Sequence, residues 1–273
     1  MGNKSLALKN DIQNQLNQEV KTITLYPGYS KNGEPELFEP LSFYPGETIA
    51  IVGPTGSGKS RLLEDIECIA NGNTPTGRKV MINNEISKKD RKRATRKRIV
   101  AQLSQNMNFV IDLTVYEFLS MHARCWSVVN ASERIEWILE LANSLTGEKF
   151  KMESNVAQLS GGQSRALMIA DCALLSPAPI VLIDEIENAG INRRKAIEIL
   201  TGEDKIVFLT THDPLLALLG PTRLVIKNGG ICNIIKRTPK EEGTLRKLEI
   251  ADNKLDQLRT IMRKGGLLED FNS

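Results

Sequence analysis

The sequence is poor in the residues from which metal and disulfide sites are built. Among its 273 residues there are four cysteines and two histidines, His122 and His212. No CxxC pair is present, and no histidine cluster lies near a cysteine. This pattern indicates neither a disulfide framework nor a zinc site.

An excess of one charge and long apolar runs are also lacking. Lysine and arginine total 36 against 33 acidic residues, so the net charge of +3 gives no general preference for nucleic acid or anionic lipid. Residues 1–18 are polar and lack the apolar core of a signal peptide, and no later run approaches the ~18 apolar residues of a spanning helix. We therefore expect a cytoplasmic protein without a nucleic-acid partner, which is peripheral at the inner face of the cell membrane only through another protein.

What is present is a core-forming composition with alternating strand and helix patterns. Hydrophobic residues make up 41% of the chain, which is enough for a substantial core. Strands are predicted at 20–26, 47–52, 79–83, 98–103, 180–184, 206–210 and 223–226, and helices at 59–70, 114–145, 161–175 and 243–264. Short strands that alternate with helices predict an α/β fold with a parallel central sheet.

Residues 179–191, PIVLIDEIENAGI, predict a buried strand that ends in two adjacent carboxylates, Asp184 and Glu185. Isolated buried carboxylates are costly, so the pair favours a metal ion, a hydrogen-bonding partner or a catalytic task. The alternative is that both carboxylates merely cap the following helix.

Residues 53–60, GPTGSGKS, fit the pattern GxxxxGK[ST] between a predicted strand and a predicted helix. The glycines let consecutive backbone N–H groups surround a phosphate at the positive end of the helix. Lys59 would neutralise the β and γ oxygens, and Ser60 would offer its hydroxyl to Mg²⁺. The predicted nucleotide contacts here are Gly53, Pro54, Thr55, Gly56, Ser57, Gly58, Lys59, Ser60 and Arg61.

This phosphate loop gives the paired carboxylates a task. In P-loop NTPases, a buried strand beside the strand that carries the phosphate loop ends in an aspartate that holds Mg²⁺. Asp184 fits that position, and Glu185 could accept the proton of an attacking water. A positioned general base of this kind is worth ~10²–10⁴ in rate.

A third motif, LSGGQ at residues 159–163, precedes the Asp184 strand. Together with the phosphate loop it resembles the signature of ATP-binding cassette (ABC) ATPases, and the order of motifs agrees over roughly residues 20–237. The resemblance implies a second anion site at a helix start, formed by Ser160, Gly161, Gly162 and Gln163. Because this site would serve the nucleotide of another chain, two cassettes, identical or paralogous, would enclose two ATP molecules head to tail.

Further residues follow from the same resemblance. Gln105 would be the Q-loop glutamine that senses Mg²⁺ and the attacking water, with Gln102 as a weaker candidate. His212, in FLTTHD, resembles the switch histidine that contacts the γ-phosphate. Tyr29 would stack on adenine, and Tyr26, which ends a predicted strand, is the competing candidate.

The chain departs from the family pattern in three places. Residues 188–191, NAGI, occupy the D-loop without its aspartate, which puts cooperative hydrolysis at two sites in question. Arg61 replaces the usual threonine after Ser60. Residues 88–98 hold eight lysines and arginines in eleven positions. This basic segment is either a contact surface for an acidic partner, lipid or nucleic acid, or a solvated surface connection.

For the fold, the resemblance implies an α/β P-loop core of ABC type. An antiparallel β subdomain would come from the N-terminal strands, and a helical subdomain would be inserted at about residues 106–175. Residues 1–19 would form a polar lead-in, residues 20–237 the ATPase domain and residues 238–273 a C-terminal helical tail.

For the function, the resemblance implies ATP hydrolysis with ATP and Mg²⁺ as cofactors. The catalytic residues would be Glu185, His212, Gln105 and Lys59, and the metal ligands Ser60, Gln105 and Asp184. Two biological roles stay open. One is the energy-coupling subunit of an ABC transporter, docked on a separate transmembrane subunit. The other is a soluble ABC ATPase that remodels or activates a partner protein such as an anaerobic metalloenzyme.

Overall fold

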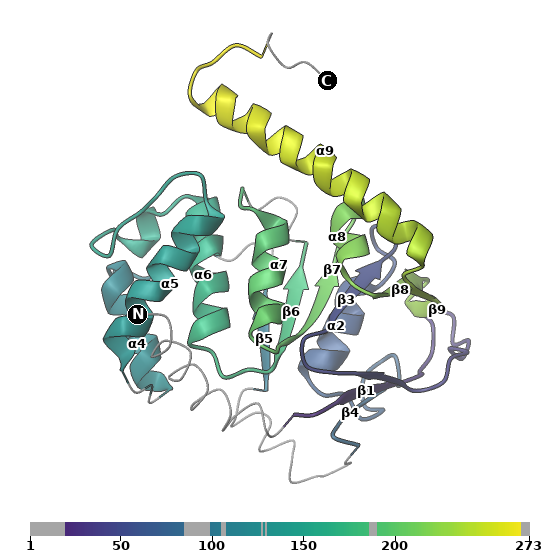
Figure 1. Cartoon of the computed structure of the whole chain (residues 1–273). Helices are drawn as coiled ribbons and strands as arrows, with labels where there is room; N and C mark the ends of the chain where they lie inside the picture. Colours follow the sequence, from purple (N-terminus) through teal and green to yellow (C-terminus); the bar gives the residue numbers. More distant parts are fainter. Residues whose placement is uncertain are drawn as a thin grey trace.

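The computed structural model describes residues 20–84, 99–104, 108–126, 128, 130–185 and 190–268. It contains a central sheet, a smaller sheet and the helices that cover them (Figure 1). The α/β class predicted from the sequence is confirmed. The lead-in at 1–19 and the basic segment at 88–98 lie outside the described residues.

The central sheet has six strands in the order β5-β6-β7-β3-β8-β9. Neighbouring strands from β5 to β8 run parallel, and β9 runs antiparallel to β8. The strands are β3 (Thr48–Val52), β5 (Val100–Leu103), β6 (Ile180–Asp184), β7 (Ile206–Thr210), β8 (Thr222–Lys227) and β9 (Gly230–Lys236). The carboxyl ends of β3, β6 and β7 therefore share one edge of the sheet, where open α/β sheets bind their ligands.

The strand order corrects one expectation. β7 lies between β3 and β6, so the strand that ends in Asp184 is not the direct neighbour of the strand that carries the phosphate loop. Asp184 pairs with Thr210 of β7, and Thr210 pairs with Ile51 of β3. The two strand ends thus face the same edge about 10 Å apart, which is twice the spacing between adjacent strands.

The smaller sheet is antiparallel and has the order β2-β1-β4. Its strands are β1 (Ile23–Tyr26), β2 (Leu41–Phe43) and β4 (Lys79–Ile82). This sheet confirms the antiparallel β part that the resemblance implied. The strand β2 was not predicted, because its three residues are too few to show an alternating pattern.

The helical prediction for residues 114–145 was wrong in one respect, because this segment forms two helices. α4 (Val115–Cys125) and α5 (Ala131–Leu145) are separated at Asn130, whose φ of 56° lies in the left-handed region. A residue in that conformation cannot continue a right-handed helix. The other helices are α2 (Lys59–Glu67), η1 (Val156–Gln158), α6 (Gly161–Leu174), α7 (Arg193–Gly202), α8 (Pro214–Leu219) and α9 (Pro239–Arg263).

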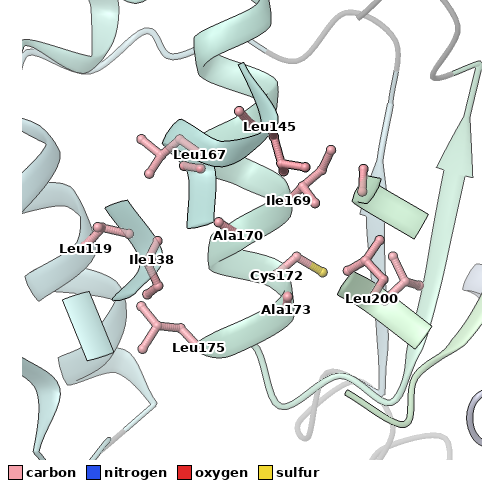
Figure 2. Close-up of a cluster of buried hydrophobic side chains, with 14 of the residues drawn as sticks. Leu119, Ile138, Leu145, Leu167, Ile169, Ala170, Cys172, Ala173, Leu175 and Leu200 are labelled. Atoms are coloured by element: carbon pink, nitrogen blue, oxygen red, sulfur yellow. The ribbon is translucent and has the colours of Figure 1, made fainter. Parts of the chain in front are cut away.

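The two faces of the central sheet bury different parts of the chain. Side chains of β6 alternate between them: Val181 and Ile183 join the core covered by α4 to α7, whereas Ile180 and Leu182 join the core beneath α2 and the smaller sheet. Figure 2 shows α6 in the middle of the first core, between side chains of α4 and α5 on one side and α7 on the other. Because both faces of β6 are buried, all its residues before Asp184 are apolar.

The long helix α9 lies across α7 and α8 at one end of the molecule (Figure 1). Arg193 of α7 binds Asp252 of α9 at 2.9 Å and Asp213, just before α8, at 2.5 Å. Arg223 of β8 binds Glu241 in the first turn of α9 at 2.5 Å. The C-terminal helix thus packs on its own chain. None of the helices in the described part of the chain has the length and apolar character needed to cross a membrane.

Candidate functional site

The phosphate loop joins β3 to α2 and leans on the turn between β8 and β9. Gly53 (φ 155°) and Gly58 (φ 107°) adopt conformations that other residues rarely take. A Cβ on Gly53 would overlap the carbonyl oxygen of Ile226, and a Cβ on Gly58 would lie 2.8 Å from the Cα of Gly229. The Gly229 N–H also donates to the Ser57 carbonyl at 2.7 Å. Close backbone approach therefore requires both glycines.

Lys59 is buried in the first turn of α2 and turns back toward the loop. Its Nζ donates to the carbonyl oxygens of Gly53 and Pro54 at 3.0 and 3.3 Å. It also lies 3.2 Å from Nε2 of His212. An anion in the loop would compete with these carbonyls for the ammonium, because charged acceptors form the stronger hydrogen bonds.

The neighbouring loop residues differ in exposure. Ser57 is buried, and its Oγ has no hydrogen-bond partner in the described part of the chain. Thr55, Gly56 and Ser60 are exposed, so the Ser60 hydroxyl at the helix start is accessible to a ligand. Arg61 is exposed as well and pairs with Glu64 on the surface of α2 at 2.6 Å.

Asp184 and Glu185, at the end of β6, share Thr210 as a hydrogen-bond partner. Thr210, fully buried on β7, donates from Oγ1 to Asp184 Oδ1 at 2.5 Å and accepts the Glu185 N–H at 3.1 Å. Glu185 itself is left-handed, with φ 51°, a conformation that side chains adopt at a cost and that clusters at functional sites. Neither carboxylate caps α7, the next helix in the described part of the chain, because Asn192 does so.

His212 follows β7 and brings the loop and the carboxylates together. Its Nε2 lies 3.2 Å from Lys59 Nζ and 3.4 Å from Glu185 Oε1. One imidazole nitrogen cannot accept from an ammonium and donate to a carboxylate at the same time, so the tautomer of His212 decides which of the two partners its Nε2 binds. Lys59, His212 and Glu185 therefore meet at the carboxyl edge of the sheet.

Tyr29, two residues before a lysine that contacts the phosphate loop, has 53% of its surface exposed. Its ring packs over Gly77, where a Cβ would lie 3.0 Å from the ring. Lys31, two residues later, donates from Nζ to the Gly56 carbonyl at 2.9 Å and so joins this segment to the loop. Tyr26 instead ends β1. The contact of Lys31 with the loop supports Tyr29 over Tyr26, and the role of Tyr29 stays a prediction.

The signature turn, residues 160–163, begins α6 with a reciprocal cap. The Ser160 Oγ accepts the Gln163 N–H at 3.3 Å, and Gln163 Oε1 accepts the Ser160 N–H at 2.9 Å. Gln163 also donates to the Glu148 carbonyl at 3.2 Å. A Cβ on Gly161 would meet nothing within 4 Å, and Gly162 lies beside Gly190 of the D-loop. This turn is set by local contacts and is exposed at Ser160 and Gly161.

Two predicted parts of the site lie outside the described residues: Gln105 and residues 188–189 of the D-loop. The role of Gln105 stays a prediction. Two described residues were missed by the sequence reasoning, namely Lys31 and Thr210. The position of Thr210 at the end of a buried strand could have indicated it, since a buried hydroxyl needs a partner. Lys31 carries no such indication.

A magnesium ion would draw on Ser60 and Asp184. A hydroxyl and a carboxylate suit this hard cation, which retains several water ligands and is held by one or two side chains together with substrate phosphates. In the described part of the chain, no group of three or more His, Cys, Asp and Glu side chains could hold a metal ion. Ser60 and Asp184 therefore fit Mg²⁺ that is bound together with a nucleotide.

Comparison with known proteins gives the family. The family described as ABC transporter matches residues 40–188. An uncharacterized ABC transporter ATP-binding protein of Methanocaldococcus jannaschii is 49% identical over 247 residues, which cover 90% of this chain and 94% of that protein. A macrolide export ATP-binding/permease protein of Campylobacter jejuni is 31% identical over 224 residues, which cover 75% of this chain and 34% of that longer protein.

Solved structures share the fold. A dimeric, post-hydrolysis ATP-binding cassette bound to ADP and phosphate aligns with a TM-score of 0.56 and 23% identity, over 79% of this chain and 99% of that one. The cbiO1 protein of Clostridium perfringens, part of an ABC transporter complex, aligns with a TM-score of 0.59 and 21% identity, over 90% of this chain and 99% of that one. The likeness confirms the ABC cassette fold. By the family match and the Methanocaldococcus relative, the chain belongs to the ABC transporter family, as an ATP-binding cassette with ATPase activity.

Proposed function

We propose that the chain binds Mg-ATP at the carboxyl edge of its central sheet, pairs with a second cassette and drives a transmembrane partner. The observation that carries the proposal is the meeting of Lys59, His212 and Glu185 beside the phosphate loop. These residues come from α2, from the end of β7 and from the end of β6. A cation, an imidazole and a carboxylate at one point suit in-line attack of water on a phosphate.

In this proposal the side chains have different tasks. Lys59 releases its loop carbonyls and binds the β and γ phosphates, with the N–H groups of the loop around them. Glu185 accepts the proton of the attacking water, and His212 contacts the γ-phosphate and orients Glu185. Tyr29 stacks on the adenine. When bound, Mg²⁺ neutralises phosphate charge, with Ser60, Asp184 and the predicted Gln105 as its ligands.

The signature turn serves the ATP of another cassette, a second copy or a paralogue. Support comes from its exposed serine and glycine at a helix start, where N–H groups attract anions. The D-loop residue Gly190 lies beside Gly162, so both motifs face the same surface. Because the D-loop lacks its aspartate, we propose that the two sites of the dimer hydrolyse ATP independently.

Transport is favoured over activation of a soluble enzyme. The relatives reported above carry transport names, one an ABC transporter ATP-binding protein and the other a macrolide export protein. We therefore propose a cytoplasmic energy-coupling subunit that reaches the inner face of the membrane through a separate transmembrane subunit. Co-purification with an integral membrane protein would support this role, whereas co-purification with a soluble metal or redox enzyme would favour the alternative.

Glu185→Gln tests the catalytic proposal. It should leave ATP binding intact and lower turnover by about 10²–10⁴, the usual contribution of a positioned base. Because hydrolysis is blocked, ATP should trap a dimer. Phosphate release and size-exclusion chromatography with Mg-ATP measure both effects. Glu198→Gln, on the exposed face of α7, is the matched control and should behave as wild type.

A second substitution distinguishes the effect on dimer formation from the effect on the catalytic base. Adding Ser160→Arg to Glu185→Gln should abolish the ATP-dependent dimer while each chain still binds ATP, because the arginine blocks only the turn offered to the other chain. Unchanged turnover in Glu185→Gln would remove this residue as the base. A strictly monomeric Glu185→Gln protein in saturating Mg-ATP would contradict the shared site.

A further inference from the structure

Behind the candidate site lies a buried group of three charged side chains, here called the Arg78 cluster: Arg78, Glu36 and Asp65. Their residues are 0%, 8% and 0% exposed. Arg78 directly precedes β4, Glu36 lies between β1 and β2, and Asp65 is on α2. The mechanism proposed above uses none of them, although burying three charges is costly unless each is paired.

Arg78 joins three segments of the chain through its guanidinium. Nε and Nη2 donate to the two carboxylate oxygens of Glu36 at 3.0 and 2.6 Å, and Nη1 donates to Asp65 at 3.0 Å. Nη2 also donates to the Gly229 carbonyl at 2.7 Å. Gly229 is the residue that packs against Gly58 of the phosphate loop. The cluster therefore reaches the loop through a single residue.

Glu36 connects the same cluster to the segment that carries Tyr29. Its Oε2 accepts the Gly28 N–H at 2.8 Å, and its Oε1 accepts the Ile231 N–H at 2.5 Å. A Cβ on Gly28 would lie 2.7 Å from Cγ of Arg78, so the backbone just before Tyr29 rests on the arginine stem. Glycine is needed here because there is no room for a side chain.

A second connection runs through Thr76. The Tyr29 N–H donates to the Thr76 carbonyl at 2.7 Å, and the Thr76 hydroxyl donates to Asp65 Oδ2 at 2.8 Å. Asp65 lies on α2, the helix that directly follows the phosphate loop. The Tyr29 segment is thus tied to α2 as well as to the turn after β8.

Opposite charges hold the Arg78 cluster together. Burial by itself would lower the pKa of Arg78, but the hydrogen bonds and charges of Glu36 and Asp65 outweigh it and raise the pKa above its ordinary value. Arg78 therefore stays cationic. Its paired contact with Glu36 uses both carboxylate oxygens, which fixes orientation as well as distance. Moving either Glu36 or Asp65 away from Arg78 would leave a buried charge without its partner.

We propose that Arg78 is a positioning residue for nucleotide binding, which holds the Tyr29 segment and the phosphate loop at a fixed separation. One ligand can then meet the aromatic ring with its base and the loop with its phosphates, and pre-organisation of both walls increases affinity. This inference rests on the proposed function, because it takes Tyr29 as the residue that stacks on adenine. It predicts that loss of Arg78 weakens the binding of a nucleotide more than the binding of a polyphosphate that has no base.

The test compares Mg-ATP with inorganic tripolyphosphate as probes. Arg78→Met keeps the length of the stem and removes the guanidinium. We expect it to raise the Kd for ATP about tenfold, the scale of one lost stacking contact, and to change the Kd for tripolyphosphate less than about twofold. The kcat at saturating ATP should stay near wild type, because Arg78 touches no reacting atom. Arg78→Lys, which retains a cation, should restore part of the ATP affinity.

Two further variants test whether a general loss of stability explains the result. Arg223→Met removes another arginine pair, which joins β8 to Glu241 of α9 at 2.5 Å, and should leave both Kd values unchanged. If Arg78→Met does not fold, Glu36→Gln carries the test, since the amide keeps the shape and removes the charge. Equal losses of ATP and tripolyphosphate affinity in the folded variant would overturn the positioning role.

A double-mutant cycle with Tyr29→Ala distinguishes this inference from the proposed function. Where Tyr29 is already alanine, Arg78→Met should not weaken ATP binding further, because the two residues act through one contact. Independent, multiplicative effects overturn the inference and leave the proposed function standing. If Tyr29→Ala does not change the Kd for ATP, the assignment of Tyr29 fails, and the positioning role fails with it.

Discussion

The phosphate loop and the signature turn are both helix starts, but the chain holds them in different ways. The start of α2 has no side-chain cap and depends on remote backbone, with Gly58 against Gly229 and Gly53 against Ile226. The start of α6 is fixed by a reciprocal hydrogen-bond pair between Ser160 and the residue three positions later. One anion site is therefore built by the whole fold, whereas the other is built locally, as suits a surface offered to another chain.

The largest expected difference between the two helix starts comes from matched glycine substitutions. Gly58→Ala places a methyl group 2.8 Å from the Cα of Gly229 at a φ of 107°. The unfavourable φ alone costs about 1–3 kcal/mol, so the melting temperature should fall and ATP binding should be lost. Gly161→Ala enters open space and should change neither. Thermal unfolding and ATP titration measure both, and equal losses would refute the contrast.

The same contrast explains what could be predicted from the sequence. GPTGSGKS and LSGGQ were both placed at helix starts, because each is continuous in sequence and each favours its local geometry. The Arg78 cluster was not predicted. Its bonds join residues that are 151 positions apart, from Arg78 to Gly229, and 195 positions apart, from Glu36 to Ile231. Nothing in a local pattern indicates such a pair.

The strand order and the choice of tyrosine have the same cause. Each buried strand is apolar, but an apolar pattern does not indicate which strands lie beside it. The position of β7 between β3 and β6 was therefore not predicted. Tyr26 and Tyr29 could not be separated by spacing alone. The contact from Lys31 to the Gly56 carbonyl favours Tyr29, and it joins two segments 25 residues apart.

A smaller effect is expected when the local cap of the signature turn is removed. Ser160→Ala should cost about 1 kcal/mol, the usual value of a side-chain cap, and lower the melting temperature by about 2–4 °C. ATP binding to the single chain should be unchanged, because the phosphate loop does not depend on this cap. Turnover should fall, since the serine is presented to the nucleotide of the other cassette.

The chain offers a matched control for this substitution. α4 begins with the same reciprocal cap, formed by Thr114 and Glu117. Thr114→Ala should lower stability by a similar amount and leave the turnover per folded molecule near wild type. Steady-state ATPase assays beside thermal unfolding separate the two effects. If Thr114→Ala reduces turnover as much as Ser160→Ala, loss of a helix cap is the cause, and Ser160 has no special role.

The smallest expected effect is the loss of helix-cap stability in acid. It arises because the reciprocal cap uses Glu117 in α4 and Gln163 in α6. The Thr114 N–H and hydroxyl donate to the carboxylate of Glu117 at 2.7 and 2.8 Å, which holds the pKa of Glu117 below its ordinary value of 4.5. A carboxylate with a lowered pKa stabilises the folded state above the ordinary value and loses that contribution as pH falls through the lowered one. Gln163, the equivalent residue of α6, does not titrate.

Acidification below the ordinary pKa should therefore loosen the first turn of α4 before the first turn of α6. Amide hydrogen exchange, expressed as protection relative to the middle of α5, follows each turn separately. Glu117→Gln should give α4 the pH response of α6, because it replaces the titrating group with the amide that the signature turn already uses. Parallel loss of protection at both turns would mean that the carboxylate is not the cause. A difference confined to α4 would show that a glutamine keeps the signature turn intact in acid, which a glutamate at that position could not do.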